Sequence, residues 1–468
     1  MLVEPIWGEY PASKGRKTKI THFRPLNASN LSYLLTKHVA RYIKIKLVDN
    51  KPVPMPIQPP REVLEQLLTV LHGWAWSNQV SGIINCPTLR SDGSILAHQG
   101  YDKATQLWGS WDDNLVLPPI LETEDAARKA LKLYTDLLVG FPFVSELDKS
   151  VAIAGILTTV LRGGFDLAPM FLVLATTAGT GKSFMVDIIS NIATGRDCPV
   201  ITTGKREEEF EKRLGALLLE GVSLFSIDNI THDLQGEQLN QMLTQRIVKI
   251  RILQKSKMPE TEWRGTLFAT GNNIRLSGDV TRRGLVCNID AMDERPELRA
   301  FDFNPIEYVL ADRGKYVAAA LTIARAYRER CGNASCSPIA SYEEWSAIVR
   351  EPLIWLGMDD PVKSQDQAHK DDPKRSAARE LIAQWSEHFG TTKDYKAAEI
   401  IAKAVEKVPN WNSDEPDPYV RGELYNLLVE RVGGRNGLDP MKLGYWLREL
   451  CNQVHSVDDV RYRIIEFF

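Results

Sequence analysis

The sequence lacks the features of a membrane-spanning, secreted or zinc-binding protein. No apolar run approaches the roughly 20 residues that a transmembrane helix requires, and the first residues, MLVEPIWGEYPASKGRK, contain no apolar core of a signal peptide. None of the six cysteines forms a C-x-x-C pair, and the closest two, Cys331 and Cys336, have no neighbouring His or Cys that would complete a zinc site. We therefore expect reduced thiols, a cytoplasmic location and no membrane partner.

The sequence also lacks a large excess of either charge. Its 57 Lys and Arg residues nearly balance 60 Asp and Glu residues, which leaves a net charge of -3. The total charge therefore does not indicate a nucleic-acid partner, although a local basic surface is compatible with it, because electrostatic steering depends on how charges are distributed. With 468 residues, 44% of them hydrophobic, the chain is long enough for several domains with cores of their own.

Hydrophobic patterns along the chain predict an α/β protein with four regions. Residues 1–120 combine short extended stretches and turns, which predicts a small α+β region. In residues 121–304 apolar strands alternate with helices, as in a domain built on a parallel sheet. Residues 305–390 are almost entirely helical, and residues 391–468 have the helix, helix, strand order of a winged-helix-like module.

Local signals within these regions give finer predictions. The run PVPMPIQPP at 52–60 predicts an extended connector. Turn signals at Asp92-Gly93 and at Gly100 predict a small hairpin unit within residues 82–108. Three tryptophans of the later helices are expected to anchor a core: Trp345, Trp355 and Trp385.

The segment MFLVLATTAGTGKS at 170–183 predicts a strand, a phosphate-binding loop and the start of a helix. Gly179 and Gly181 allow the backbone to turn so that successive N–H groups point at phosphate oxygens, and the helix presents its positive end to the same anion. Lys182 is expected to reach the β- and γ-phosphates of ATP, and the Ser183 hydroxyl to bind Mg²⁺. The expected nucleotide contacts are Thr177, Ala178, Gly179, Thr180, Gly181, Lys182, Ser183 and Phe184.

The loop departs from the usual template at Thr176, which stands in place of its first glycine. An accidental match is the alternative, but the apolar strand before the loop and the helical pattern after it argue against one.

A second apolar strand, Val222 to Ile227, ends in Asp228-Asn229. An aspartate at the end of a strand beside the phosphate loop suits the magnesium shell. In hydrolases of this type a glutamate that polarises water usually comes next, and Asn229 stands there instead. Either another residue supplies the base or hydrolysis is slow. The candidate bases are Glu208, Glu209 and Glu211.

Two further segments complete the expected site. The strand Thr266 to Thr270 runs into Asn272 and Asn273, either of which can hold the attacking water; a simple Asn-rich turn is the alternative. Arg282 and Arg283 precede the apolar strand from Leu285 to Ile289. In a ring-shaped NTPase one of them would stabilise charge on a neighbouring subunit's γ-phosphate, and otherwise they form a solvated surface.

A basic segment between these strands is the candidate DNA contact. Lys249 and Arg251 alternate with isoleucines, which predicts a strand with one basic face, and Lys255 and Lys257 lie at the expected hairpin tip. Such a tip can grip phosphates without reading bases; an edge strand blunted by lysines is the alternative. A weaker candidate is the C-terminal helix that carries Lys442, Tyr445, Trp446 and Arg448, in which Trp446 is expected to belong to the core.

Taken in order, these motifs resemble the AAA+/superfamily 3-like ATPase modules of primase-helicases from bacterial prophages and mobile elements. The resemblance covers roughly residues 80–390. It rests on PTLRSDGSI and GYDKATQL within 87–107, AGTGKS at 178–183, EEEFEKRL at 207–214, SIDNI at 226–230, ATGNNIRLSGDVTRRGL at 269–285, ERPELRAF at 294–301 and WSAIVREPLIWLGMDDP at 345–361.

The resemblance implies an AAA+ core, ATP and Mg²⁺ as cofactors, a ring that is most often a hexamer, and movement along single-stranded or forked DNA. It assigns Lys182 and Ser183 to phosphate and magnesium, Asp228 to the second magnesium position, Asn272 or Asn273 to the sensor, and Arg282 or Arg283 to the arginine finger. Family members often carry a primase domain, but no acidic metal-binding triad is visible in residues 1–80, so a primase is expected only as a possible partner domain or protein.

Three functions remain open from the sequence. The first is a ring-shaped DNA helicase or translocase. The second is an ATP-switched replication initiator or helicase loader, which is favoured by Asn229 in the place of the usual glutamate. The third is a small-molecule kinase, which the long helical region after residue 305 and the paired arginines disfavour.

Overall fold

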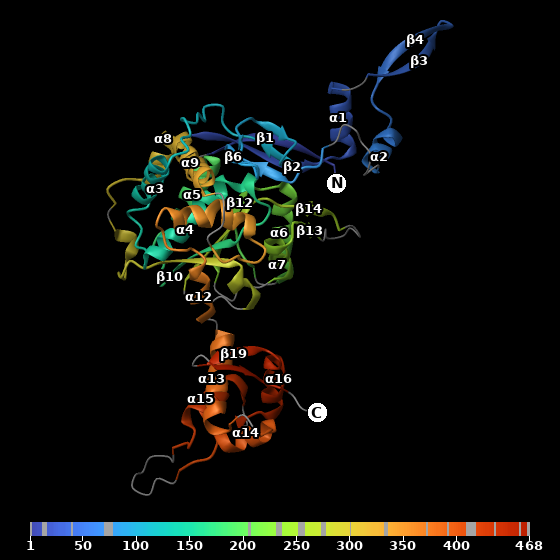
Figure 1. The fold of residues 1–468 in the computed structure, drawn as a ribbon. Helices are drawn as coiled ribbons and strands as arrows, with labels where there is room; N and C mark the ends of the chain where they lie inside the picture. The colour runs from blue at the N-terminus through green and yellow to red at the C-terminus, as the bar shows by residue number, and fades with distance from the viewer. Residues whose placement is uncertain are drawn as a thin grey trace. The chain divides into compact units, whose positions relative to one another are not determined.

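The computed structural model describes most of the chain, namely residues 2–11, 16–38, 41–69, 78–204, 207–230, 236–250, 258–272, 278–299, 301–331, 336–370, 373–390, 393–408, 418–434, 437–457 and 460–465. The chain divides into two compact units (Figure 1). The first comprises Met1–Ile274 and Arg282–Gln365, and the second comprises Arg275–Thr281 and Asp366–Phe468. The helical region predicted at 305–390 contributes helices to both units, and the four-region division stays a prediction.

Within the described residues, five strands form a parallel sheet in the first unit, which confirms the predicted α/β fold class. The strands lie side by side in the order β11 (Val200–Ile201), β12 (Leu224–Ile230), β15 (Thr266–Asn272), β10 (Met170–Ala175) and β16 (Gly284–Ile289). Because the strands are parallel, all their carboxyl ends lie at one edge. β15 is inserted between β10 and β12, although it follows both in the chain.

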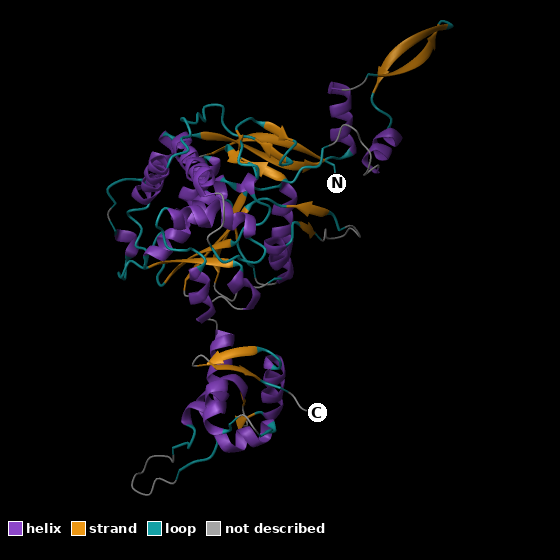
Figure 2. Ribbon diagram, in the orientation of Figure 1, coloured by secondary structure: helices purple, strands orange, loops and turns teal. Residues whose placement is uncertain are grey.

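The predicted central strand is fully buried, since all six residues of β10 are inaccessible to solvent. Its Phe171 stacks on Phe268 of β15 at 5.6 Å between ring centroids. Helices pack around the sheet (Figure 2). Those that contact it or each other are α3 (Glu124–Leu137), α4 (Glu146–Val160), α5 (Lys182–Thr194), α8 (Pro305–Ala311) and α9 (Arg313–Cys331).

The starts of these helices follow from their capping residues. Thr123 accepts a hydrogen bond from the Ala126 N–H at the start of α3, and Ser145 accepts one from Asp148 at the start of α4. α4 is buried on all sides along most of its length, which explains its uniformly apolar sequence. Both helices lie in the region 121–304, where helices were predicted to alternate with apolar strands.

Further helices of the first unit are α6 (Glu207–Glu220), α7 (Glu237–Thr244), α10 (Glu343–Trp345), α11 (Glu351–Trp355) and α12 (Lys363–Lys370), the last of which continues into the second unit. A π-helical turn at Ser346–Arg350 joins α10 to α11. Trp345 is a core residue as predicted: it is fully buried and its indole donates to Thr158 Oγ1 at 2.8 Å. Trp355 and Trp385 are partly buried and pack at the margins of two different cores.

The N-terminal segment consists of β1 (Val3–Pro11) and β2 (Lys17–Pro25), α1 (Ala28–His38), β3 (Tyr42–Val48) and β4 (Lys51–Ile57), and α2 (Arg61–Thr69). The connector predicted at 52–60 is wrong for most of its length, because β4 pairs antiparallel with β3. Pro52, Pro54 and Pro56 alternate with Val53 and Met55, so the N–H groups of one side of the strand can still bond to β3. The three prolines, which have no N–H group, then all lie at positions where the backbone N–H would point away from β3.

The hairpin unit predicted at 82–108 is present, with one turn displaced. It contains β5 (Gly82–Ile84), β6 (Thr88–Leu89), β7 (Ile95–Leu96), β8 (Gly100–Asp102) and β9 (Leu107–Gly109). The Asp92-Gly93 turn joins β6 to β7 as predicted. Gly100, however, begins β8 rather than a turn. The turn follows, where the Gln106 N–H donates to the Asp102 carbonyl and Thr105 donates to the Asp102 carboxylate.

The second unit has its own core, formed by α13 (Pro373–His388), α14 (Ala397–Ala404), α15 (Gly422–Val432) and α16 (Pro440–Leu450). Short strands β17 (Gly433–Gly434) and β18 (Gly437–Leu438) pair, as do β19 (Val454–Val457) and β20 (Val460–Arg463). Two helices and a terminal strand were predicted here and are confirmed; the winged-helix-like assignment stays a prediction. None of the helices among the described residues combines the length and apolar character that a bilayer crossing demands.

Candidate nucleotide-binding site

The loop between β10 and α5 is a tight turn closed by its own side chains. Gly179 has φ of 78° and Gly181 has φ of 103°, values that favour glycine. Buried Thr180 donates to the Thr177 carbonyl at 2.9 Å, and the two threonine hydroxyls are 3.1 Å apart. The loop leads directly into the first turn of α5 at Lys182, so its N–H groups and the helix end converge. The geometry fits a phosphate group.

Lys182 is held at the mouth of this loop by two oxygen atoms. Its Nζ donates to Asn272 Oδ1 at 2.6 Å and to the Thr177 carbonyl at 3.3 Å. The contact with Asn272 exists because β15 adjoins β10, in a register that pairs Ala175 with Asn272. Burial lowers the pKa of Lys182, and the charge of Asp228 partly offsets that shift.

Asp228 accepts hydrogen bonds from two hydroxyl groups of the site. Ser183 Oγ donates to Asp228 Oδ1 at 3.3 Å, and Thr270 Oγ1 donates to the same oxygen. A hydroxyl and a half-buried carboxylate side by side are the hard oxygen donors that Mg²⁺ prefers, with water and phosphate completing its shell. The described residues contain no group of three or more His, Cys, Asp and Glu side chains suited to a metal. A magnesium ion here would therefore depend on phosphate and water for the rest of its ligands.

Asn229 lies in a β-bulge of β12, where the pairing with β15 shifts between Ile227 and Ile230. Its φ is 52°, in the left-handed region, and its side chain is exposed. Asn adopts this conformation far more readily than Glu does. The residue that replaces the expected glutamate therefore suits the backbone that it occupies. The predicted end of the strand at Ile227 is also corrected, since β12 continues through the bulge to Ile230.

The alternative bases Glu208, Glu209 and Glu211 lie on α6, which follows β11, the outer strand on the β12 side. Glu209 forms an exposed ion pair with Arg213 on the same helix. The structure does not assign the base to any of the three.

Several residues beside the loop were missed from the sequence. Asp187, one helical turn after Ser183, has its pKa raised to about 6 by burial; the hydrogen bond from the Cys198 N–H lowers the pKa, and the charges of Asp197 and Asp228 raise it by smaller amounts. Phe141 stacks on Phe184 at 6.2 Å, and a Cβ on Gly181 would lie 3.4 Å from the Phe141 ring. An acidic side chain four residues after Ser183 in an apolar helix is a signal that could have drawn attention to Asp187.

Glu297 is a further missed neighbour of the loop. A Cβ on Gly179 would lie 3.2 Å from its carboxylate. Glu297 belongs to the ERPELRAF segment, which was noticed in the sequence without a role for this residue. Phe184, an expected nucleotide contact, is partly exposed beside the loop.

Arg282 and Arg283 lie away from the loop of their own chain. The Met170 N–H donates to the Arg283 carbonyl, so the pair adjoins the amino end of β10, and β10 spans about 17 Å at roughly 3.3 Å per residue. Arg283 is buried, and its Nη1 donates to the Asn240 carbonyl at 3.1 Å. Arg282 is exposed. The structure thus distinguishes a packing arginine from an accessible one.

The basic hairpin is present in the part that the structure describes. β13 (Ile247–Lys249) pairs antiparallel with β14 (Glu260–Glu262). Val248 and Ile250 are buried whereas Ile247 and Lys249 are exposed, as the alternation predicted. Lys249 forms a 3.4 Å ion pair with Glu260. Arg251, Lys255, Lys257 and the sensor candidate Asn273 lie outside the described residues.

On the C-terminal helix α16, Lys442, Tyr445 and Arg448 are exposed, and Trp446 is partly buried against the core of the second unit, as predicted.

Comparison with known proteins gives only distant matches. No family model matches the sequence, and no curated protein does. A solved structure of the NrS-1 C terminal region, in its A apo form, is 11% identical with a TM-score of 0.38 over 88% of this chain and 91% of that chain. A structure described as SCCmec type IV Cch, active helicase, is 12% identical with a TM-score of 0.32 over 98% of this chain and 93% of that chain. Similarity at this level supports no inference about this chain.

Proposed function

We propose that this chain is an ATP-dependent DNA helicase or translocase that acts as a ring, with an ATPase core of the AAA+ type. The observation that carries the ATPase part is the meeting of Lys182 with Asn272 and of Ser183 with Asp228 at one edge of the sheet. Four polar side chains from two strands and one helix converge on a loop whose glycines are shaped for phosphate. This convergence is what binding and cleaving a nucleoside triphosphate requires.

In this function Lys182 binds the β- and γ-phosphates, and Ser183 and Asp228 hold the magnesium ion. When bound, Mg²⁺ supplies neutralisation of phosphate charge. Asn272 is placed beside Lys182, where its amide can orient the attacking water. Asn273 stays an alternative for that role.

The arginine finger acts between subunits. Arg282 is exposed and lies far from the loop of its own chain, where a neighbouring copy can approach it. The burial of Arg283 and its bond to Asn240 favour Arg282 over Arg283 for this role. A closed ring of identical subunits, six by the family resemblance, gives every site one such arginine.

The hairpin of β13 and β14 contacts DNA. Buried Val248 and Ile250 fix it to the domain, while Lys249 faces solvent in its ion pair with Glu260. Arg251, Lys255 and Lys257 follow in the sequence and lie outside the described residues. Positive charge of this kind binds the phosphate backbone without reading bases. The replication of a phage or mobile element, and a primase domain or protein as partner, rest on the sequence resemblance alone.

ATP turnover and duplex unwinding together test this proposal. Purified protein should hydrolyse ATP faster with single-stranded DNA and should unwind a forked duplex at low salt, and Lys182→Ala should abolish both. Lys249→Glu should lower the DNA stimulation several-fold without changing basal turnover. Lys132→Glu, which alters an equally exposed lysine in an ion pair on α3, is the matched control. ATP hydrolysis with neither DNA binding nor unwinding would overturn the helicase assignment.

A second function, an ATP-switched initiator or helicase loader, is favoured by Asn229 at the position of the expected base. A switch needs tight ATP binding and slow turnover. A protein of this kind would assemble with ATP and bind duplex DNA, but single-stranded DNA would not accelerate its turnover.

A further inference from the structure

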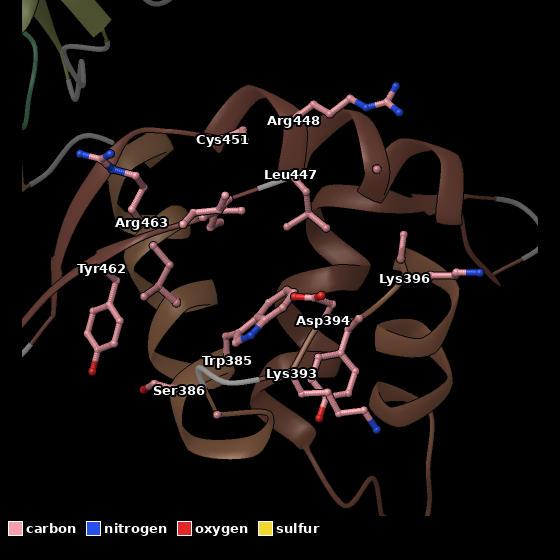
Figure 3. Close-up of a pocket in the computed structure, with 17 residues that line it drawn as sticks. Trp385, Ser386, Lys393, Asp394, Lys396, Leu447, Arg448, Cys451, Tyr462 and Arg463 are labelled. Carbon is pink, nitrogen blue, oxygen red and sulfur yellow. The ribbon is translucent and has the colours of Figure 1, made fainter. Parts of the chain in front are cut away.

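The second unit contains a cavity of ≈ 520 Å³ that the ATPase site does not use. It lies among α13, α14, α16 and β20, and Figure 3 shows the side chains that line it. The indole of Trp385 and the side chain of Leu447 project into the space, whereas Lys396, Arg448 and Arg463 extend at its edges. Volumes of this size accommodate ligands of about one nucleotide and more.

The charged side chains that line the cavity are mostly positive. Four cationic side chains line it, namely Lys393, Lys396, Arg448 and Arg463, and each is exposed. Among the described lining residues Asp394 is the single carboxylate. Since the whole chain carries a net charge of -3, this local excess is a property of the site and not of the composition.

The floor of the cavity is formed by aromatic rings that their neighbours hold in place. Trp385 packs at 5.5 Å from Phe389 and edge-to-face at 6.2 Å from Tyr395. Lys393 lies over the Tyr395 ring at 5.5 Å, and Lys403 lies over both Tyr395 and Phe389. Rings fixed by their neighbours and flanked by cations form the platform on which single-stranded nucleic acids stack.

A path for adjoining nucleotides leads away from the cavity along α16. Lys442, Tyr445 and Arg448 are exposed at successive intervals of three residues, so they form one stripe on the helix. Arg448 belongs to both the stripe and the cavity rim. The stripe rises about 9 Å over six residues, which is of the order of one or two nucleotide steps.

We infer that the second unit binds single-stranded nucleic acid, with a base stacked in the cavity floor by Trp385 and phosphates paired with the cations of the rim. Asp394 can accept a hydrogen bond from an amino group on the base edge. This site goes beyond the proposed helicase function and does not depend on it, because it uses neither Lys249 nor the ATP loop. An acidic peptide is the competing ligand, and the aromatic floor argues against it.

Binding of a fluorescein-labelled 12-nucleotide DNA strand to the full chain, measured by anisotropy without ATP over a range of salt, tests the inference. The rim variant Lys396→Glu/Arg463→Glu should bind at least about tenfold more weakly, and its log–log salt slope should be shallower by about 1.4, or 0.7 per lost contact. The control Lys407→Glu/Lys363→Glu changes two exposed lysines outside the cavity and should bind like the wild type. Basal ATP turnover should be unchanged in both variants.

Two further measurements separate stacking from charge alone. Trp385→Leu should weaken binding by at least about fivefold, whereas Trp385→Phe, which keeps a ring, should retain most of it. An abasic strand of equal length should bind more weakly than the normal strand, and polyglutamate of equal charge should compete poorly. Equal binding by the abasic strand or by polyglutamate would overturn the inference in favour of a general polyanion surface.

The outcomes also separate this inference from the proposed function. Rim variants that bind like the wild type, while Lys249→Glu binds weakly, would refute the cavity site and leave the helicase proposal intact. Strand binding that depends on the rim, in a protein whose ATP turnover does not respond to DNA, would retain the site and refute the helicase.

Discussion

Lys182 Nζ lies 2.6 Å from Asn272 Oδ1, although 90 residues separate the two in the sequence. The phosphate-binding lysine and the candidate sensor amide are thus already in contact before any nucleotide is considered. In the proposed function, phosphate would compete with the amide for the N–H groups of the ammonium, and an Asn272 oxygen released in this way could accept a hydrogen bond from water. Phosphate binding and positioning of the water would then be linked through one hydrogen bond.

Removing the sensor amide should separate ATP binding from hydrolysis. In Asn272→Ala the lysine keeps its positive charge and its bond to the Thr177 carbonyl, so affinity for a fluorescent ATP analogue should change by less than about threefold. The turnover number should fall by about 10²- to 10³-fold, the scale for losing one oriented polar contact in a transition state. Lys182→Ala should lose both properties. A variant at 272 that binds ATP as poorly as Lys182→Ala would contradict the assigned role.

A glutamate at position 229 should have two opposite effects: it would supply the missing base, and it would strain the left-handed backbone there. Asn229→Glu should raise ATP turnover by about tenfold or more, since a carboxylate polarises water better than an amide does. It should also reduce the free energy of unfolding by about 1 kcal/mol, because Glu is disfavoured at φ of 52°. Asn229→Gly, which suits the conformation and brings no base, is the control for stability. Unchanged turnover in the glutamate variant would mean that another residue already supplies the base.

The two adjacent arginines should behave as different kinds of residue. Arg282→Ala should abolish ATP turnover, whereas Arg283→Ala should lower stability by about 1 to 3 kcal/mol through its lost bond to Asn240. Mixing inactive Arg282→Ala with inactive Lys182→Ala should restore part of the activity, because some mixed interfaces then hold an intact lysine and an intact arginine. If the mixture stays inactive while both variants assemble, Arg282 does not act between subunits.

Asp187 should make the first unit less stable as pH rises. Its folded pKa of about 6 exceeds the ordinary value of 3.8, because burial favours the neutral acid. The stabilisation is fully present below about pH 4 and is lost as pH rises through 6. Asp187→Asn should therefore raise the free energy of unfolding at pH 7.5 by about 1 to 2 kcal/mol, a value reduced for partial solvent exposure.

Urea unfolding without nucleotide or Mg²⁺ measures this effect, and the difference between variant and wild type should vanish at pH 4. The asparagine can still accept the 2.9 Å hydrogen bond from the Cys198 N–H. Asp136→Asn, which changes an exposed acid on α3, is the control and should show no such pH dependence. A stabilisation by Asp187→Asn that is equal at both pH values would exclude titration of Asp187 as its cause.

The sequence predicted the strands and the loop well because their signals are local. Six buried apolar residues before the loop predicted β10, and the apolar runs before Asp228 and Asn272 predicted β12 and β15. Reliance on local signals also explains the wrong prediction at 52–60. Prolines there are a local signal against a strand, but they do not occupy the positions of β4 whose N–H groups face β3.

What the sequence did not predict depends on pairing between distant segments. The contact of Lys182 with Asn272 follows from the order of strands in the sheet, which no local pattern encodes. The bulge that turns Asn229 outward is a mismatch in length between two strands, and it is visible only once they are paired. The raised pKa of Asp187 likewise requires burial by residues far along the chain.

The place of β15 in the sheet also constrains how the protein is made. β10 and β12 are synthesised first, but neither is hydrogen-bonded to the other, because β15 separates them. A nascent chain that ends before residue 266 therefore has two apolar strands with unpaired edges that cannot yet form the sheet. The two strands that pair with β10 are β15 and β16, and both follow it far along the chain. During translation the apolar β10 therefore has no partner strand in the sheet until β15 has emerged.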